Sequence, residues 1–269
     1  MRTKTKAWLN LVLFLVTLAV NTLGALGFIN GMSQKEISDT YPTLITPSAS
    51  TFSIWGVIYV LLLIALVYMV VKHQEARTAN LIDAISLPFW VSSAANILWI
   101  TTFSYDWIGI STLLILLLVI SLAVLNSRLK APEGIGQRVN SLAFGLYNGW
   151  LIIATVVNVS AFLVQQQWNG FGLGADAWAV VILIVALILS SLILIKLRNA
   201  ALTLPLAWAY YGIWQEHQAA GKFAGLYPEV ATTALVIAIL YVVIAGVVFI
   251  RNGKCLLPRT LAQMEGTKK

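Results

Sequence analysis

Long apolar runs recur along the whole chain, and they constrain its fold more than any other feature. A helix needs about 17 to 25 apolar residues to cross the hydrocarbon core of a bilayer, and most of the runs reach that length. They lie at about 7–29, 51–71, 85–104, 107–127, 141–164, 176–195, 201–216 and 231–250. The sequence therefore predicts an all-α polytopic membrane protein.

Composition agrees with this fold class. Hydrophobic residues make up 59% of the chain and charged residues 10%, against about 45–50% and about 25% in soluble domains. The net charge of +7 comes from basic residues that lie between apolar runs, which is typical of membrane topology, so nucleic acid is not an expected partner. Cys255 is the only cysteine, so neither an internal disulfide nor a cysteine metal cluster is expected.

The number of spans depends on the run at 201–216, which is short and contains Pro205. Seven spans are the alternative to eight. With eight spans and a cytoplasmic N-terminus, only Lys35 and Lys222 of the 17 Lys and Arg fall on the outer side, as the positive-inside rule requires. We therefore expect eight spans in the cell membrane with both termini cytoplasmic. The first run is longer than the apolar part of a signal peptide, and we expect it to be a retained helix.

The cores of the expected spans contain no Asp, Glu, His or Lys. Six such residues flank the apolar runs and are expected at helix ends or in loops: Asp83, Asp106, Asp176, Glu229, His73 and His217. Ion coupling, an axial-histidine haem and a carboxylate dyad each need such groups inside the bilayer. The sequence also contains no HExxH, GxSxG or phosphate-binding glycine motif. We therefore expect no catalytic residue, no metal and no cofactor.

Three apolar runs carry aromatic and amide residues at i, i+3, i+7 spacing. The sets are Phe52, Trp55 and Tyr59; Asn96, Trp99 and Phe103; and Tyr147, Trp150, Ala154 and Asn158. At about 3.6 residues per turn, each set occupies one helix face. We expect these faces to point into the bundle, because an amide that faces lipid loses its hydrogen bonds. There the amides, with those of Asn21 and Asn148, either tie helices together or bind a ligand.

The same residues resemble a known family. The segment TPSASTFSIWGVIY at 46–59 resembles the proline, aromatic, Trp and Leu-Tyr signature of the tryptophan-rich sensory protein (TspO/MBR) family, which includes the mitochondrial translocator or peripheral benzodiazepine receptor. Asn96-x-x-Trp99 with Phe103 resembles its N-x-x-W motif, and residues 147–158 resemble its Y-x-x-W-x-x-x-A-x-x-x-N motif. Three departures bear on the pocket mouth: one proline at Pro47 instead of two, Phe52 one residue nearer the Trp, and Leu146 in place of a proline.

The resemblance implies a five-helix bundle over residues 1–164, followed over 165–269 by the three additional spans of longer family members. It implies a cavity between the first, second and fifth spans, beneath the loop that joins the first two. Flat apolar molecules, tetrapyrrole-like or sterol-like, are the implied ligands. The implied ligand-binding residues are Pro47, Phe52, Trp55, Tyr59, Asn96, Trp99, Tyr147, Trp150 and Asn158.

Two further patterns carry structural expectations. Ser33 and Glu36 have the spacing of a capping box, which predicts a short helix in the first external loop, about residues 30–50. That loop acts either as a lid or as an ordered connector. Gly145 and Gly149 form a GxxxG motif, which predicts the close approach of a neighbouring helix, with added room at the aromatic face as a second role.

The leading hypothesis is a TspO-type membrane protein that binds, or also transports, a porphyrin-like or sterol-like molecule. A transporter that works by alternating access without intramembrane charges is the first alternative. An enzyme that acts on a bound pigment or lipid is the second alternative. The expected partners are the ligand and the lipid bilayer, and a homodimer is left open.

Overall fold

The computed structural model describes residues 1–129 and 134–258, and every regular element in these ranges is a helix. The long helices are α1 (Thr3–Ala25), α3 (Ile54–Val71), α4 (Ala76–Ser104), α5 (Ile108–Ser127), α6 (Ile135–Gln165), α7 (Ala175–Leu197) and α9 (Pro228–Arg251). The shorter ones are α2 (Gln34–Thr40), α8 (Thr203–Glu216) and the 3-10 turns η1 (Ala49–Ser53), η2 (Gly170–Gly172) and η3 (Ala200–Leu202). The all-α prediction is therefore confirmed.

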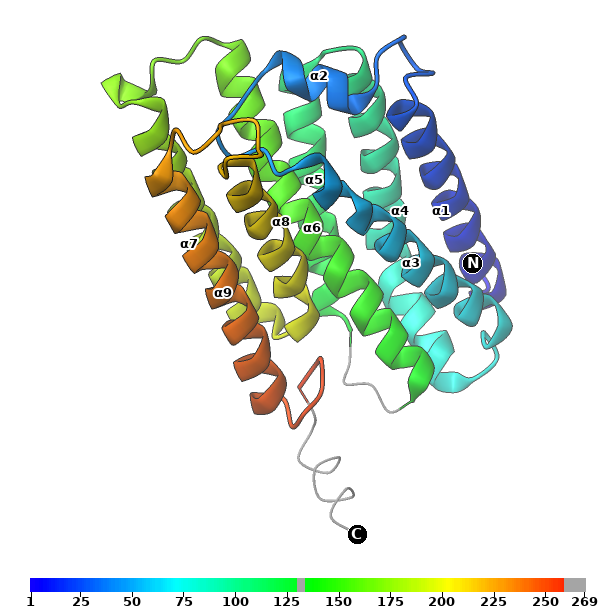
Figure 1. The fold of residues 1–269 in the computed structure, drawn as a ribbon. Coiled ribbons are helices and arrows are strands. Elements are labelled where there is room, and N and C mark those ends of the chain that lie inside the picture. The colour runs from blue at the N-terminus through cyan, green and yellow to red at the C-terminus, as the bar shows by residue number, and fades with distance from the viewer. Residues whose placement is uncertain (130–133, 259–269) are drawn as a thin grey trace.

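Seven of the described helices are long and apolar enough to cross a membrane. The run predicted as the seventh span forms η3 and α8, and α8 has only 14 residues, about 21 Å at 1.5 Å per residue. It packs against α6 and α9 and runs alongside them (Figure 1). The seven helices thus have the lengths and composition of a multi-pass membrane protein, and α8 is shorter than any of them.

Helix α4 corrects one expectation about charge. It has 29 residues and begins at Ala76, well before the apolar run that starts near residue 85. Asp83 therefore lies inside a helix and not at its end. Its carboxylate is half-exposed and pairs with Lys6 Nζ at 2.8 Å. The first turns of α4 are polar, so the apolar run marks only the part of the helix that suits the bilayer.

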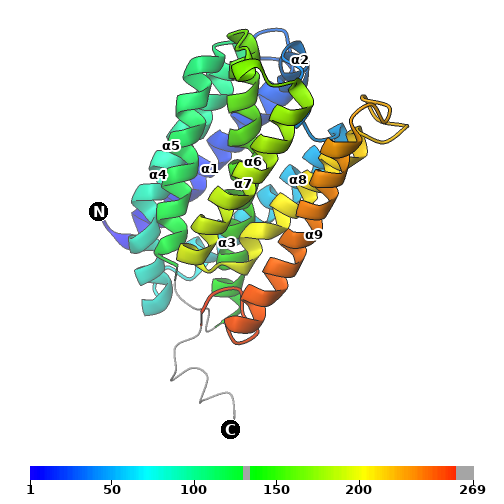
Figure 2. The same ribbon diagram turned by 90° about the vertical axis from the view of Figure 1, so that its left-hand side faces the viewer.

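Helix α6 is the centre of the bundle, as predicted. It contacts α3 and α5 on one side and α8 and η3 on the other. Its apolar window is 72% buried, against 28% for α3, α7 and α9. In Figure 2, α4 and α5 lie at the left and α8 and α9 at the right, while α7 crosses in front of α6 and contacts α5 as well as α6 and α9. The later helices therefore share α6 with the earlier ones.

The glycines of α6 make this sharing possible. A Cβ on Gly149 would lie 2.0 Å from the Leu202 carbonyl oxygen, and one on Gly145 would lie 2.7 Å from Asn199 Nδ2. Side chains there would push η3 away from α6. The predicted close approach is thus present, and the segment that approaches is η3. The atoms nearest to both glycines belong to residues 199–202, so the glycines make room for this segment and not for the aromatic rings.

The chain begins and ends its helices toward the same end of the bundle. Helix α1 starts and α9 finishes toward the lower end in Figure 1, and α2 covers the opposite end. The predicted capping box is present at α2, since Ser33 Oγ accepts from the Glu36 backbone N–H at 3.2 Å and Ser33 N–H donates to Glu36 Oε2 at 2.7 Å. Four residues of the charge count lie outside the described residues: Lys130, Arg259, Lys268 and Lys269.

Candidate functional site

Five of the predicted residues meet in one group of rings between α3 and α6. Trp55 stacks on Tyr59 with 5.0 Å between ring centroids. It also makes edge-to-face contacts with Trp150, at 6.1 Å, and with Tyr147, at 6.2 Å. Phe52 packs edge-on against Trp150 at 5.7 Å. These are the separations and orientations that aromatic pairs favour. We call Phe52, Trp55, Tyr59, Tyr147 and Trp150 the aromatic cluster.

Burial varies across the aromatic cluster. Trp150 is 2% exposed, because α6 lies at the centre of the bundle, whereas Phe52 is 37% exposed on η1 at the outer end of α3. Phe52 is therefore the most exposed ring of the cluster, and Trp55 and Tyr59 are half-buried. The predicted inward orientation of Trp150 is confirmed.

An amide chain joins the aromatic cluster to α1 and α4. Asn21 Nδ2 donates to Asn96 Oδ1 at 2.6 Å, and Asn96 Nδ2 donates to the Tyr147 hydroxyl at 2.9 Å. Asn21 Nδ2 also donates to the Thr17 carbonyl at 2.8 Å. Each of these bonds satisfies a group that would otherwise be unpaired in the bundle. The predicted Asn96 thus reaches the cluster through Tyr147.

A small cavity lies beside Tyr59 and Tyr147. Its volume is about 10 Å³, and its lining consists of Phe14, Thr17, Tyr59, Leu62, Phe89, Ser93 and Tyr147. That is the room of about one water molecule, so the bundle is closed around the aromatic cluster in this structure. The sequence analysis did not select Phe14 or Phe89. The i, i+3, i+7 spacing of Phe14, Thr17 and Asn21 in the first run was the signal that could have found the former.

Two predicted residues belong to a separate network between α4, α5 and α6. Asn158 Oδ1 accepts from Trp99 Nε1 at 2.9 Å. Asn158 Nδ2 donates to Ser111 Oγ at 3.1 Å and to Thr112 Oγ1 at 2.8 Å. Both N–H groups of this amide are therefore used between helices. Of the predicted residues, only Tyr59 and Tyr147 line the small cavity. Trp99 and Asn158 bond to each other and to α5 and not to the aromatic cluster, so the predicted set is divided.

Pro47 lies apart from both the aromatic cluster and the Asn158 network. It lines a second cavity, of about 20 Å³, between the first external loop and the end of α8. Thr46, Glu216 and Phe223 are among its other lining residues. The proline signature grouped Pro47 with the rings, but the loop places it in the lining of this cavity, with Glu216 at the end of α8.

Comparison with protein families bears on all of these residues. Residues 7–247 match the family model described as TSPO-like protein. The chain belongs to the TSPO-like family. No curated protein and no solved structure matches this chain. The TSPO-like match continues past residue 164, where the five-helix bundle was predicted to end, and includes α7, α8 and most of α9.

Within this TSPO-like bundle, two buried groups near the middle of α6 have no hydrogen-bond partner. One is the indole Nε1 of Trp150 in the aromatic cluster, and the other is the side-chain amide of Asn148, at both its nitrogen and its oxygen. Unpaired buried polar groups are rare in folded proteins, and each calls for an explanation. Among the residues that the structure describes, no group of three or more His, Cys, Asp or Glu could hold a metal ion.

Proposed function

We propose that this protein binds a flat apolar molecule, porphyrin-like or sterol-like, at the aromatic cluster, as a membrane ligand-binding or sensory protein. The observation that carries the proposal is the unpaired indole N–H of Trp150, a buried ring that packs against Phe52 and Trp55. A buried donor without a partner costs about 1–3 kcal/mol. A carboxylate, carbonyl or hydroxyl on a bound ligand would accept from it, while the rings stack on the ligand's flat face.

Binding requires the aromatic cluster to open, because the adjacent cavity has only about 10 Å³. Phe52 is the member that we expect to move. It is 37% exposed, it sits on a 3-10 turn, and its ring covers the edge of Trp150. Displacement of η1 would therefore uncover the indole without disturbing α6.

The topology we propose has eight crossings in the cell membrane, with α8 as the short one and both termini in the cytoplasm. Three observations support it. Helices α1 and α9 begin and end toward the same end of the bundle (Figure 1). Lys35 and Lys222, the two basic residues expected outside, lie together beside α2 at the other end. The α8 segment runs between the bundle ends next to α6 and α9.

We propose binding without catalysis. The members of the aromatic cluster and of its amide chain are rings, phenol hydroxyls and amides, and none is a carboxylate, an imidazole or a thiol. Such groups orient a ligand, whereas acid–base chemistry near neutral pH needs a side chain that titrates there. The lipid bilayer and the ligand are the partners that this function needs.

The test is a titration of the purified protein in lipid nanodiscs with protoporphyrin IX, followed by quenching of Trp fluorescence. Trp150→Phe keeps a ring but removes the donor, so we expect the dissociation constant to rise about three- to tenfold, the equivalent of one hydrogen bond. Trp178→Phe is the matched control, because Trp178 Nε1 is also buried and unpaired but lies on α7 beside Trp168.

Equal affinities for the wild type and Trp150→Phe, or no saturable binding by the wild type, would contradict the proposed site. The same samples separate the alternatives. Loss of the pigment spectrum with time would indicate an enzyme, and accumulation of porphyrin inside vesicles would indicate a transporter.

A further inference from the structure

The part of the first external loop that leads into α3 is bound along α8. The backbone N–H of Ser48 donates to the Gly212 carbonyl at 3.1 Å, and Trp208 Nε1 donates to the Thr51 carbonyl at 2.9 Å. A Cβ on Gly212 would lie 2.0 Å from Thr51 Oγ1, so the glycine is what allows this contact. Thr51 is 0% exposed as a result. The turn η1, which carries Phe52, therefore rests on α8.

The first loop also contacts the residues at and after the C-terminal end of α8. His217 is buried, and its Nε2 lies 2.8 Å from the Leu44 carbonyl oxygen, to which it donates. Its ring stacks on Phe223 at 4.7 Å and meets the edge of Tyr227 at 5.9 Å. The side chain of Ser48 donates to Gln215 Oε1 at 3.1 Å. The connection between α8 and α9 is thus folded around a histidine that reaches into the first loop.

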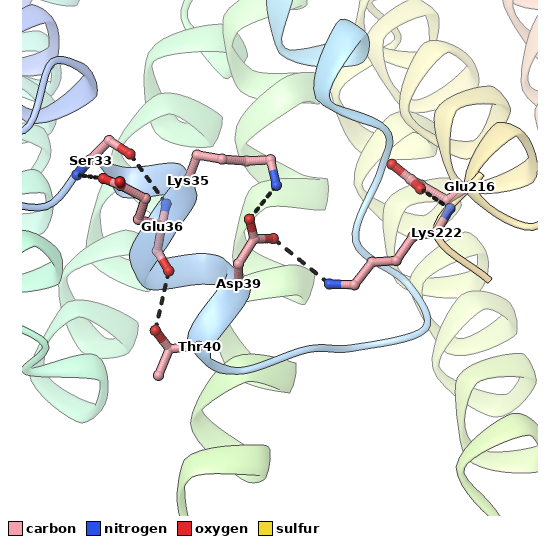
Figure 3. Close-up of polar contacts among 7 residues, drawn as sticks. All are labelled: Ser33, Lys35, Glu36, Asp39, Thr40, Glu216 and Lys222. Carbon is pink, nitrogen blue, oxygen red and sulfur yellow. Dashed lines mark hydrogen bonds and ion pairs between the residues drawn. The ribbon is translucent and has the colours of Figure 1, made fainter. Parts of the chain in front are cut away.

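The outermost contact is ionic. Lys35 and Lys222 approach Asp39 from different sides (Figure 3), the former from within α2 and the latter from the α8–α9 connection. Lys222 Nζ lies 3.8 Å from Asp39 Oδ1. The backbone N–H of Lys222 donates to Glu216 Oε2 at 2.9 Å, which ties the lysine to the end of α8. Asp39 is therefore the point at which α2 is joined to the later helices.

We propose that residues 217–227, which connect α8 to α9, are a latch that holds the first external loop closed over the aromatic cluster, and that release of this latch admits the ligand. The inference rests on the proposed function and adds the element that controls access. The loop ends in Phe52, whose ring covers Trp150, so any contact that fixes the loop also fixes that ring. The latch belongs to the last helices, which gives the α8–α9 hairpin a role at the ligand site.

The chemistry of these contacts suits a reversible device. The Lys222–Asp39 pair is half-exposed, and water competes with exposed ion pairs, so each such contact is weak. The amide chain and the Asn158 network, in contrast, are buried among helices. We therefore expect the Lys222–Asp39 pair to break first; the contacts of Thr51 and His217, which are buried, must then part for the loop to leave α8.

A ligand-independent experiment measures this opening. In a Cys255→Ser background, Thr51→Cys places a thiol at a fully buried position beneath α8, and a water-soluble maleimide labels it only when η1 lifts. Lys222→Glu places like charges opposite Asp39 and beside Glu216, and we expect it to raise the labelling rate about fivefold through a larger open population. Lys35→Glu is the matched control, because Lys35 pairs with Asp39 within α2 and joins nothing to α8.

Two further variants complete the labelling experiment. His217→Ala removes the bond to Leu44 and is expected to raise labelling in the same direction as Lys222→Glu. Asp39→Lys, combined with Lys222→Glu, restores an opposite-charge pair and is expected to return the rate to that of the background. Labelling that stays unchanged in both Lys222→Glu and His217→Ala would overturn the latch.

The second experiment closes the latch covalently. Asp39→Cys and Lys222→Cys, again with Cys255→Ser, are joined by a reducible bis-methanethiosulfonate linker, and the association rate of protoporphyrin IX is measured. We expect the rate to fall about tenfold and to recover with reductant, because only the open population binds. A linker between Lys35→Cys and Asp39→Cys stays within α2 and should leave the rate unchanged.

The outcomes distinguish the two proposals. Porphyrin that binds the linked and reduced proteins at equal rates would overturn the latch and leave the proposed function in place. A protein that binds no porphyrin in either state would contradict the proposed function, while the labelling of Thr51→Cys would still decide whether the latch exists.

Discussion

Helix α6 carries two polar regions that differ in one respect. Around Asn158, both amide N–H groups and the carbonyl oxygen are bonded to α4 and α5. Around Trp150, rings are packed closely but the indole N–H is bonded to nothing. Both regions follow from the same i, i+3, i+7 stripe on one helix. The two regions have similar residue types and differ in whether their polar groups are paired. A region with every polar group bonded ties helices together, whereas one with an unpaired donor is a candidate binding site.

The largest expected effect is that of Trp150→Ala. Trp150 is 2% exposed and contacts Phe52 and Trp55, so the truncation should cost about 3–5 kcal/mol of stability, as for other buried Trp residues. Denaturant unfolding of the protein in mild detergent measures it, and the folded fraction should bind porphyrin weakly. A severely destabilised protein that bound porphyrin unchanged would make Trp150 a packing residue only and would remove the contrast with Asn158.

Asn158→Leu is expected to have the second-largest effect. It removes bonds to Trp99, Ser111 and Thr112, and interhelical bonds in membranes contribute about 0.6–2 kcal/mol each, so we expect a loss of about 2 kcal/mol. Porphyrin affinity should not change, because Asn158 bonds to Trp99, Ser111 and Thr112 and to no member of the aromatic cluster. Unfolding and titration of the same sample test both parts. An altered selectivity among related porphyrins would instead place Asn158 at the ligand and erase the distinction.

The smallest expected effect is that of Asn148→Leu, which is the matched control for Asn158→Leu. Asn148 is 0% exposed and neither atom of its amide has a partner. Replacing an unpaired buried amide with an apolar side chain of similar size is close to neutral or stabilising. We therefore expect the unfolding free energy to change by less than about 1 kcal/mol, or to rise. A loss as large as that of Asn158→Leu would show that Asn148 has a partner, such as an ordered water.

Periodicity explains what could be predicted of the fold and of the site. Trp150 and Asn158 point inward because the apolar and aromatic spacing in residues 147–158 follows the helix repeat, which is a local property. The capping box at Ser33 is also local, since Ser33 and Glu36, three residues apart, bond to each other. Helix ends were less predictable, as α4 shows: hydropathy marks the part of a helix that suits lipid, and the helix continues while its backbone bonds are satisfied.

Contacts between distant segments were not predictable in the same way. The sequence predicted that Gly145 and Gly149 receive a neighbour, but any helix could have filled that groove, and η3 does. Gly212 gave no signal at all, because its role depends on Thr51, far away in the chain. Pro47 and Asn158 were grouped with the rings on the strength of motifs, but the loop places Pro47 beside the end of α8, and Asn158 bonds to α4 and α5 further along α6.

The sequence by itself determined an all-helical membrane protein of the TSPO-like family, because hydropathy, helical periodicity and motif spacing are written along the chain. Only the tertiary structure decided that the aromatic cluster is closed, that Trp150 lacks a partner while Asn158 is fully bonded, and that the loop before α3 is bonded to α8. Those features depend on which atoms meet across helices. A side chain's pattern in sequence specifies the face it occupies, but the partner on the opposite face decides whether its polar group is satisfied.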